Sequence, residues 1–296
     1  MKIEFNSGKF QAIVNGKVVA ESTNKHYLKQ KVAKMSTSVS FASAPVEQEE
    51  ENTALRFPIN QRFNFVERLV KMVASGKTAS ALITGEGGLG KSHTVIKALE
   101  AAGLDNISGI DLDGAEAPAG SFVVVKGYST AKGLYRTLYE NRNSIIVFDD
   151  CDSILKDDDA VNLLKGALDS YDVRIISWNT TRPDEELPRS FQFTGGVVFI
   201  SNRPMNKIDQ ALRTRSMCVD LTMTMDQKLD RMEVIMAGND FLPMVSMSHK
   251  RDALNLIREL KDQAREVSLR TLITVARIRA ENDADWADLA TYSLVA

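Results

Sequence analysis

Four short runs of apolar residues alternate with segments of helical periodicity in the middle of the chain. The runs, rich in Val, Ile and Phe, occupy residues 81–84, 122–125, 145–148 and 197–200. Apolar stretches of this length are typical of strands that are buried on both faces of a parallel sheet. Between and around them the spacing of apolar residues predicts helices at 63–73, 91–102, 130–142 and 157–168. Strands that alternate with helices indicate right-handed crossovers. We therefore predict an α/β domain whose parallel sheet is covered by helices on both faces.

After residue 221 the pattern predicts only helices. In the first of these, Leu229, Met232 and Met236 recur at helical spacing, which we interpret as plain core packing. Further helices are predicted after it, followed by a short tail that docks through Trp286. The predicted elements lie at residues 226–237, 249–263, 269–279 and 283–296.

The first 35 residues predict a small separate module. Three short strands, at 2–5, 10–14 and 17–21, precede a Lys-rich helix at 25–35, and Asn15-Gly16 is a strong signal for a hairpin turn. The next 17 residues are small and polar and end in acidic residues, as in a flexible linker. The predicted division is a basic module at 1–35, a linker at 36–52, an α/β domain at 53–221 and an all-α lid with a tail at 222–296.

Composition narrows the class of protein. With 44% apolar and 26% charged residues among 296, the chain reads as an ordinary globular protein. We expect no membrane span, because no apolar run reaches about 18 residues, and a cytoplasmic location, because the N-terminus lacks an apolar signal core. Two cysteines and three histidines favour neither disulfides nor a zinc site. The formal charge is −2, but residues 1–35 carry seven Lys and two Glu. The lysines of the predicted helix either contact nucleic acid or form a solvated face: Lys25, Lys29, Lys31 and Lys34.

The stretch that follows the first run carries a phosphate-binding pattern. Gly85 and Gly90-Lys91-Ser92 fit the P-loop spacing, and the stretch lies between a predicted strand and a predicted helix. Glycines let backbone N–H groups converge on an anion, and the helix N-terminus attracts negative charge. Lys91 is predicted to reach the β- and γ-phosphates of ATP, and Ser92 to bind Mg²⁺. His93 is predicted to lie beside the phosphates without a chemical role. The predicted nucleotide-binding residues are Gly85, Glu86, Gly87, Gly88, Leu89, Gly90, Lys91, Ser92 and His93.

The third run ends in acidic residues. Asp149 is predicted to hold Mg²⁺, and Asp150 to orient or deprotonate the attacking water. The alternative is a strand end that enters a polar loop. Ligands of such sheets bind beyond the carboxyl ends of the strands. The P-loop, Asp149 and Asn202 all follow strand ends, so one pocket can hold all three.

Together these motifs resemble those of AAA+ ATPases, from about Arg56 to about Glu281. The resemblance implies that Asn202 is sensor 1, which orients the water. It also implies that Arg215, at the end of the segment 208–215, is an arginine finger acting on a neighbouring subunit's ATP, with Arg213 as the alternative. Arg270 resembles sensor 2.

The chain departs from the family pattern at Asp150, where most members have Glu. The shorter carboxylate leaves open whether Asp150 or Asp152 polarises the water.

Two further features of the resemblance concern the substrate. An insert at 169–196, with strands expected at 173–178 and 191–194, corresponds to a hairpin that faces the ring channel in one superclade. Lys126 and Tyr128 stand where many members place a pore loop, although a capped turn is the alternative. The sequence around Trp178 and Phe193 is similar to that of ATPases encoded by tailed bacteriophages. This resemblance implies that the protein is located in the cytoplasm of the host cell.

The sequence thus predicts a Mg²⁺-dependent ATPase that forms a ring, a hexamer by resemblance, and remodels or translocates a polymer. Nucleic acid is slightly favoured over protein as the substrate. The alternatives are a slow ATP-dependent switch or loader, a protein-remodelling chaperone with a protein substrate or adaptor, and a binding module whose ATP site only stabilises assembly.

Overall fold

The computed structural model divides the chain into two compact units, Met1–Asn52 and Thr53–Ala296. Several predicted features lie outside the described residues: the Asn15-Gly16 turn, residues 26–35 of the basic helix, the linker, Tyr128 and residues 180–186 of the insert. The structure describes residues 2–6, 8–14, 17–25, 56–110, 116–127, 129–169, 171–179, 187–281 and 284–296.

The first unit contains a three-stranded antiparallel sheet in the order β1-β2-β3. The strands are β1 (Lys2–Asn6), β2 (Lys9–Val14) and β3 (Lys17–Ser22). Their small core consists of Ala12 and Ala20, which pair across β2 and β3. The predicted β-rich module is therefore present.

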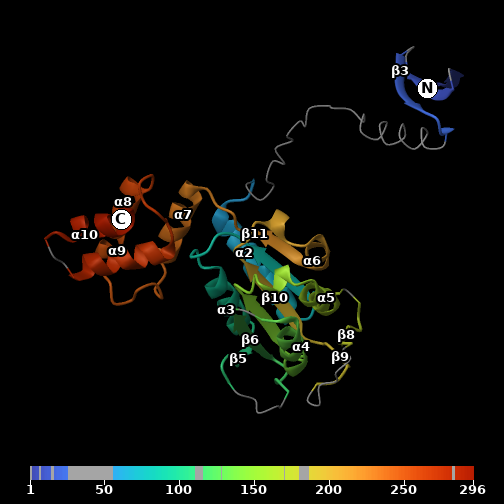
Figure 1. The fold of residues 1–296 in the computed structure, drawn as a ribbon. Coiled ribbons are helices and arrows are strands. Elements are labelled where there is room, and N and C mark those ends of the chain that lie inside the picture. Colours follow the sequence, from blue (N-terminus) through green and yellow to red (C-terminus); the bar gives the residue numbers. More distant parts are fainter. Residues whose placement is uncertain are drawn as a thin grey trace. The chain divides into compact units, whose positions relative to one another are not determined.

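The second unit contains a six-stranded sheet in the order β11-β4-β10-β7-β6-β5, in which all neighbours pair in parallel (Figure 1). Four strands match the apolar runs of the sequence. They are β4 (Ser80–Thr84), β6 (Ser121–Lys126), β7 (Ile145–Asp149) and β10 (Gly196–Ser201). The edge strands β5 (Asp105–Asn106) and β11 (Met217–Asp220) were not predicted.

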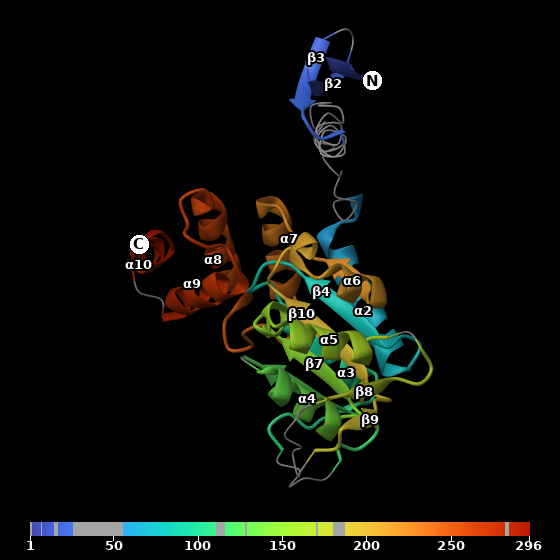
Figure 2. The same ribbon diagram turned by 45° about the vertical axis from the view of Figure 1, so that its right-hand side comes forward.

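Helices cover both faces of this sheet, as predicted (Figure 2). Successive residues of a strand point to opposite faces. Accordingly Ile145 and Val147 pack with α2 (Ile59–Ala74) and α3 (Lys91–Ala101) in one core, whose other residues include Val66 and Leu99.

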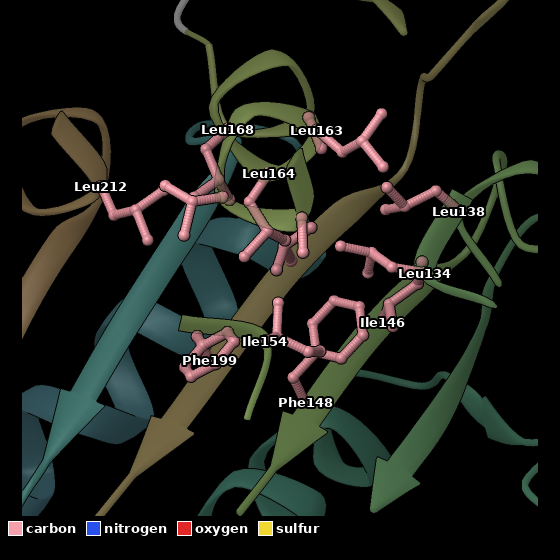
Figure 3. Packing of buried hydrophobic residues seen from close by; sticks show 14 of the residues in the cluster. Leu134, Leu138, Ile146, Phe148, Ile154, Leu163, Leu164, Leu168, Phe199 and Leu212 are labelled. Atoms are coloured by element: carbon pink, nitrogen blue, oxygen red, sulfur yellow. The ribbon is translucent and has the colours of Figure 1, made fainter. Parts of the chain in front are cut away.

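The second core lies on the other face of the sheet. There Ile146 and Phe148 meet Leu134 of α4 (Ala131–Glu140) and Leu164 of α5 (Asp158–Ala167) (Figure 3). Two layers of helices thus enclose the sheet and fix its strand ends.

Helix boundaries follow local capping chemistry. The side chain of Thr130 accepts a hydrogen bond from the Gly133 N–H at 3.1 Å and starts α4. Asp157 caps α5 in the same way. Among the predicted helices around the sheet, α2 differs most from its predicted span, because it begins at Ile59, directly after the N-cap Pro58 with φ of −52°, rather than at Phe63.

The insert forms a short antiparallel hairpin of β8 (Ile175–Ser177) and β9 (Ser190–Gln192), shorter than predicted. Its buried residues, Ile176 and Phe191, pack into the core beside α4 and α5. A one-turn 3₁₀ helix, η2 (Ile154–Lys156), precedes α5, and η3 (Met205–Lys207) leads to α6 (Gln210–Arg215).

The C-terminal region is all helical: α7 (Met225–Met236), α8 (Met247–Leu260), α9 (Leu269–Glu281) and α10 (Trp286–Val295). These helices share a core of their own, which includes the predicted stripe of Leu229, Met232 and Met236. Trp286 packs against this core and lies 5.0 Å below the Arg279 guanidinium. Among the described residues, no helix combines the length and apolarity needed to cross a membrane.

Candidate nucleotide-binding site

The loop between β4 and α3 has the backbone of an anion cradle. Gly85, Gly88 and Gly90 have φ of +137°, +75° and +90°, a region that favours glycine. A Cβ on Gly85 would lie only 2.9 Å from the backbone carbon of Leu221. Because α3 begins at Lys91, the unpaired N–H groups of its first turn point into this loop. The loop therefore fits a phosphate group.

Lys91 places a buried ammonium inside the loop. Its Nζ donates hydrogen bonds to the carbonyl oxygens of Gly85 and Glu86 at 2.7 and 2.6 Å, and to Oδ1 of Asn202 at 2.9 Å. Burial lowers the pKa of Lys91, and the charges of Asp150 and Asp149 oppose that change. The charged ammonium is thus positioned between the glycine loop and the end of β10.

Ser92 and Asp149 place side-chain oxygens next to each other beside the loop. The Ser92 hydroxyl donates to Oδ1 of Asp149 at 2.7 Å, and Asp149 is 3% exposed. The ammonium of Lys126 lies 3.0 Å from the other oxygen, Oδ2. Hydroxyl and carboxylate oxygens are the donors that Mg²⁺ prefers, with water completing its shell. The donor set fits this ion.

Asp150 turns back toward the loop. It is a non-glycine residue with φ of +57°, in the left-handed region. Its Oδ1 accepts a hydrogen bond of 2.5 Å from Nδ2 of Asn202. Desolvation and the neighbouring charge of Asp149 raise the pKa of Asp150. Asp152, in contrast, accepts from the hydroxyl of Ser201 at 2.6 Å. Of the two candidate acids, Asp150 lies with Lys91 and Asn202.

The C-terminal helices reach the same loop. The backbone N–H of Leu269, the first residue of α9, donates to the carbonyl of Gly88 at 2.8 Å. Arg270 is the next residue and is exposed. Lys228 of α7 pairs with Glu86. Helices far along the chain therefore border the P-loop, and Arg270 stands at that border.

Arg215 lies at the opposite end of the strands, away from the P-loop. Its carbonyl accepts from the hydroxyl of Ser80, the first residue of β4, whereas the P-loop follows the last residue of that strand. A five-residue strand spans about 16 Å. Arg215 Nη1 donates to the Ala211 carbonyl at 3.2 Å. Arg213 is on the same short helix, so the structure brings neither arginine to the site of its own chain.

A groove that sequence reasoning missed adjoins the loop. It has a volume of about 720 Å³ and is mainly apolar. No local sequence signal marks it, because its walls come from helices far apart in the chain. The predicted residues Gly90 and His93 line it, together with Thr94, Ile235, Phe241 and Leu269.

Part of the chain matches a known protein family. Residues 81–227 match the ATPase family associated with various cellular activities (AAA). This part of the chain belongs to the AAA family. The AAA segment runs from β4 into α7 and contains the P-loop, Asp149, Asp150, Asn202 and Arg215, whereas Arg270 lies beyond it. Family membership implies that the segment binds a nucleotide.

The chain is also similar to a bacteriophage protein. The relative is an uncharacterized 36.7 kDa protein of Enterobacteria phage T4, from the nrdC-mobD intergenic region, with 28% identity over 296 residues. The match covers 94% of this chain and 86% of the relative. The likeness therefore extends beyond the AAA segment, and it associates the chain with phage-encoded AAA+ ATPases.

Proposed function

We propose that the protein hydrolyses ATP in a Mg²⁺-dependent reaction at the P-loop. The observation that carries this proposal is the convergence of Lys91, Ser92, Asp149, Asp150 and Asn202 at the mouth of one glycine loop. A site that only bound nucleotide would not need a polar amide and a second carboxylate facing the lysine.

Each side chain has a separate role in this proposal. The loop N–H groups and Lys91 hold the β- and γ-phosphates, while Ser92 and Asp149 hold Mg²⁺. When bound, the metal ion neutralises charge on the phosphate oxygens. Asp150 accepts the proton of the attacking water, and Asn202 orients that water. The two side chains are suitably placed to act together, since Asn202 already donates a hydrogen bond to Asp150.

The groove beside Gly90 suits the base of the nucleotide. Its apolar walls, formed by residues such as Ile235 and Leu269, are typical of pockets for flat aromatic ligands. Arg270 directly follows Leu269, whose N–H donates to the Gly88 carbonyl. In this proposal Arg270 therefore acts on the γ-phosphate as sensor 2. In this proposal the C-terminal helices close one side of the site.

We propose further that the protein works as a ring, with a hexamer as the expected size. Arg215 is remote from the P-loop of its own chain, and an arginine at the opposite end of the strands is suitably placed to reach a neighbour. An arginine supplied in trans stabilises the charge of the transition state. Arg213 stays the alternative finger.

The proposed substrate of the ring is a polymer, with nucleic acid favoured over protein. The N-terminal sheet presents Phe5, which is 63% exposed and lies 4.7 Å from the ring of Phe10. The ammonium of Lys25 lies 5.8 Å from the Phe10 ring. Exposed aromatic rings beside positive charge are the features that bind single-stranded nucleic acid.

Phosphate release from ATP tests the main proposal. The purified protein should release phosphate with Mg²⁺ and stop when EDTA removes the metal ion. Stimulation by single-stranded DNA favours a nucleic-acid motor, whereas stimulation by an unfolded protein favours a chaperone. Slow release that neither polymer accelerates would favour a switch or loader. ATP binding without any hydrolysis would contradict the proposal.

A further inference from the structure

Arg62, in the helix before the P-loop strand, is a buried arginine that binds its own helix to two other segments. Its side chain is 2% exposed, and burial lowers its pKa although the charge of Asp220 opposes this. Nη1 donates to the carbonyl oxygens of Asp220 and Thr222 at 3.0 and 2.7 Å. Nη2 donates to Oε1 of Gln227 at 2.9 Å. One guanidinium therefore joins α2, the end of β11 and the first turn of α7.

The end of β11 is itself bound to the strand that leads into the P-loop. The carboxylate of Asp220 accepts from the hydroxyl of Thr84, the last residue of β4, at 3.2 Å. The same oxygen accepts from the N–H and the hydroxyl of Thr222 at 2.9 and 2.7 Å. In addition, the N–H of Leu221 donates to the Thr84 carbonyl. A displacement of Thr84, where β4 leads into the P-loop, therefore acts directly on the segment whose carbonyl oxygens Arg62 binds.

On the side of the C-terminal helices, Arg62 binds the residue that caps α7. Gln227 and Thr224 form a reciprocal capping box at the start of this helix. Oε1 of Gln227 accepts from the Thr224 N–H, so Arg62 shares that oxygen with the cap. The next residue, Lys228, pairs with Glu86 of the P-loop. The start of α7 is thus bound both to α2 and to the loop that holds phosphate.

We propose that Arg62 is a positioning residue that couples the P-loop to the orientation of the C-terminal helices. Phosphate in the loop would shift Thr84 and Glu86, and Arg62 would transmit the shift to α7 through Asp220, Thr222 and Gln227. The proposal rests on nucleotide binding at the P-loop. Arg62 is too deeply buried between these segments to act as a surface charge.

The planar guanidinium suits this role better than an ammonium would. Arginine has five N–H donors in a fixed fork, so the directions of its bonds are coupled. Lysine keeps the charge but has a single nitrogen on a flexible stem. Arg62→Lys should therefore preserve the buried positive charge while losing the fixed angle between β11 and α7. Arg68 is exposed on the same helix, so Arg68→Lys provides a matched control.

The test measures the movement of the C-terminal helices relative to the α/β domain, rather than turnover alone. Fluorescent donor and acceptor dyes are placed on exposed residues of α5 and α10 through Asp158→Cys and Ser293→Cys, with Cys218→Ser to limit labelling elsewhere. A non-hydrolysable ATP analogue should change energy transfer in this otherwise wild-type protein. Arg62→Lys should lose most of the change and bind the analogue at least fivefold more weakly, and Arg68→Lys should behave as wild type.

Gln227→Ala keeps the proposal testable if the arginine variant folds poorly, because Arg62 retains both carbonyl partners. This variant should also lose the change in energy transfer, while its melting temperature falls only by the small amount expected for a lost helix cap. A purely structural role would lower the melting temperature and leave the change intact. Wild-type energy transfer and affinity in both variants would overturn the inference, as would the lack of any change in the wild-type protein. Failure of the wild-type protein to bind the analogue would instead count against the proposed function.

Discussion

The amide of Asn202 donates a hydrogen bond of 2.5 Å to Asp150, and its oxygen accepts one of 2.9 Å from Lys91. The amide thus joins the lysine predicted to hold phosphate with the acid predicted to activate water. Because Asn202 follows β10 and Asp150 follows β7, the parallel pairing of these two strands produces the contact. In the proposed function, nucleotide binding and hydrolysis therefore depend on different residues of one hydrogen-bonded network.

The first prediction separates these two steps. Lys91→Ala should weaken ATP binding, because it removes the charge that contacts phosphate. Asp150→Asn should keep binding and lower turnover, because the amide cannot accept the proton of water. Binding is measured with a fluorescent ATP analogue and turnover by phosphate release. Asp152→Asn is the matched control, since Asp152 is bound to Ser201. Wild-type turnover in Asp150→Asn together with loss in Asp152→Asn would transfer the role to Asp152.

The second prediction concerns Arg215 as a finger in trans. Such a finger contributes about 10³–10⁵ in rate, so Arg215→Ala should be nearly inactive alone. When it is mixed with Lys91→Ala, some interfaces regain an intact P-loop opposite an intact arginine. Partial activity should therefore return, as measured by phosphate release from mixed assemblies.

Arg213→Ala provides the comparison for this experiment. If Arg213→Ala is inactive and complemented while Arg215→Ala is active, the finger is Arg213. Mixed assemblies of Arg215→Ala that form, as shown by co-purification, but stay inactive would contradict a role for Arg215 in trans.

The sequence predicted the interior of the sheet but not its edges. Strands such as β7 are apolar at every position, and this is the signal that burial on both faces leaves in a sequence. β11 has only Val219 buried, and β5 is the polar pair Asp105-Asn106, so neither has a comparable signal. An edge strand is defined by its pairing with a neighbour, which a local pattern does not record.

The candidate site was predictable to a similar extent. The P-loop and the acids follow apolar strands directly, so their spacing identifies them. The bond from Leu269 to Gly88 joins residues 181 positions apart, and the groove beside it has no local signal. Arg62 was also missed, because a buried arginine in a helix is indistinguishable by sequence from a surface charge.

The third prediction tests the contact between α9 and the P-loop. A Cβ on Gly88 would lie 3.0 Å from Cβ of Ser268, whereas a Cβ on Gly103 would meet nothing within 4 Å. Both glycines have positive φ, +75° and +83°. Each alanine variant should therefore lose about 1–2 kcal/mol of stability through backbone strain. Only Gly88→Ala should also weaken binding of the ATP analogue, because its strain falls in the phosphate loop and its Cβ displaces α9.

Thermal unfolding and a binding titration of the two variants separate strain from displacement. Equal losses of affinity would show that backbone strain alone accounts for the effect. Unchanged affinity in Gly88→Ala would show that the position of α9 does not matter for the nucleotide.

The last prediction concerns nucleic acid and the N-terminal sheet. Residues 1–35 carry a net charge of +5 from seven Lys and two Glu, and phosphate contacts by lysines make affinity fall steeply with salt. Binding of fluorescent oligodeoxythymidine, with the ATP analogue present, should show this dependence. A protein without residues 1–35 should bind more weakly and show a flatter dependence.

Aromatic stacking should have a different signature. Phe5→Ala should lose about 1–3 kcal/mol of binding free energy, as expected for one stacked base, without a change in salt dependence, since no charge is removed. Val18, 49% exposed in the same sheet, provides the control variant Val18→Ala, which should bind as wild type. Equal losses in Phe5→Ala and Val18→Ala would indicate a general effect on the sheet rather than stacking. Absence of binding even at low salt would favour protein as the substrate, and the exposed Phe5 would then contact a polypeptide.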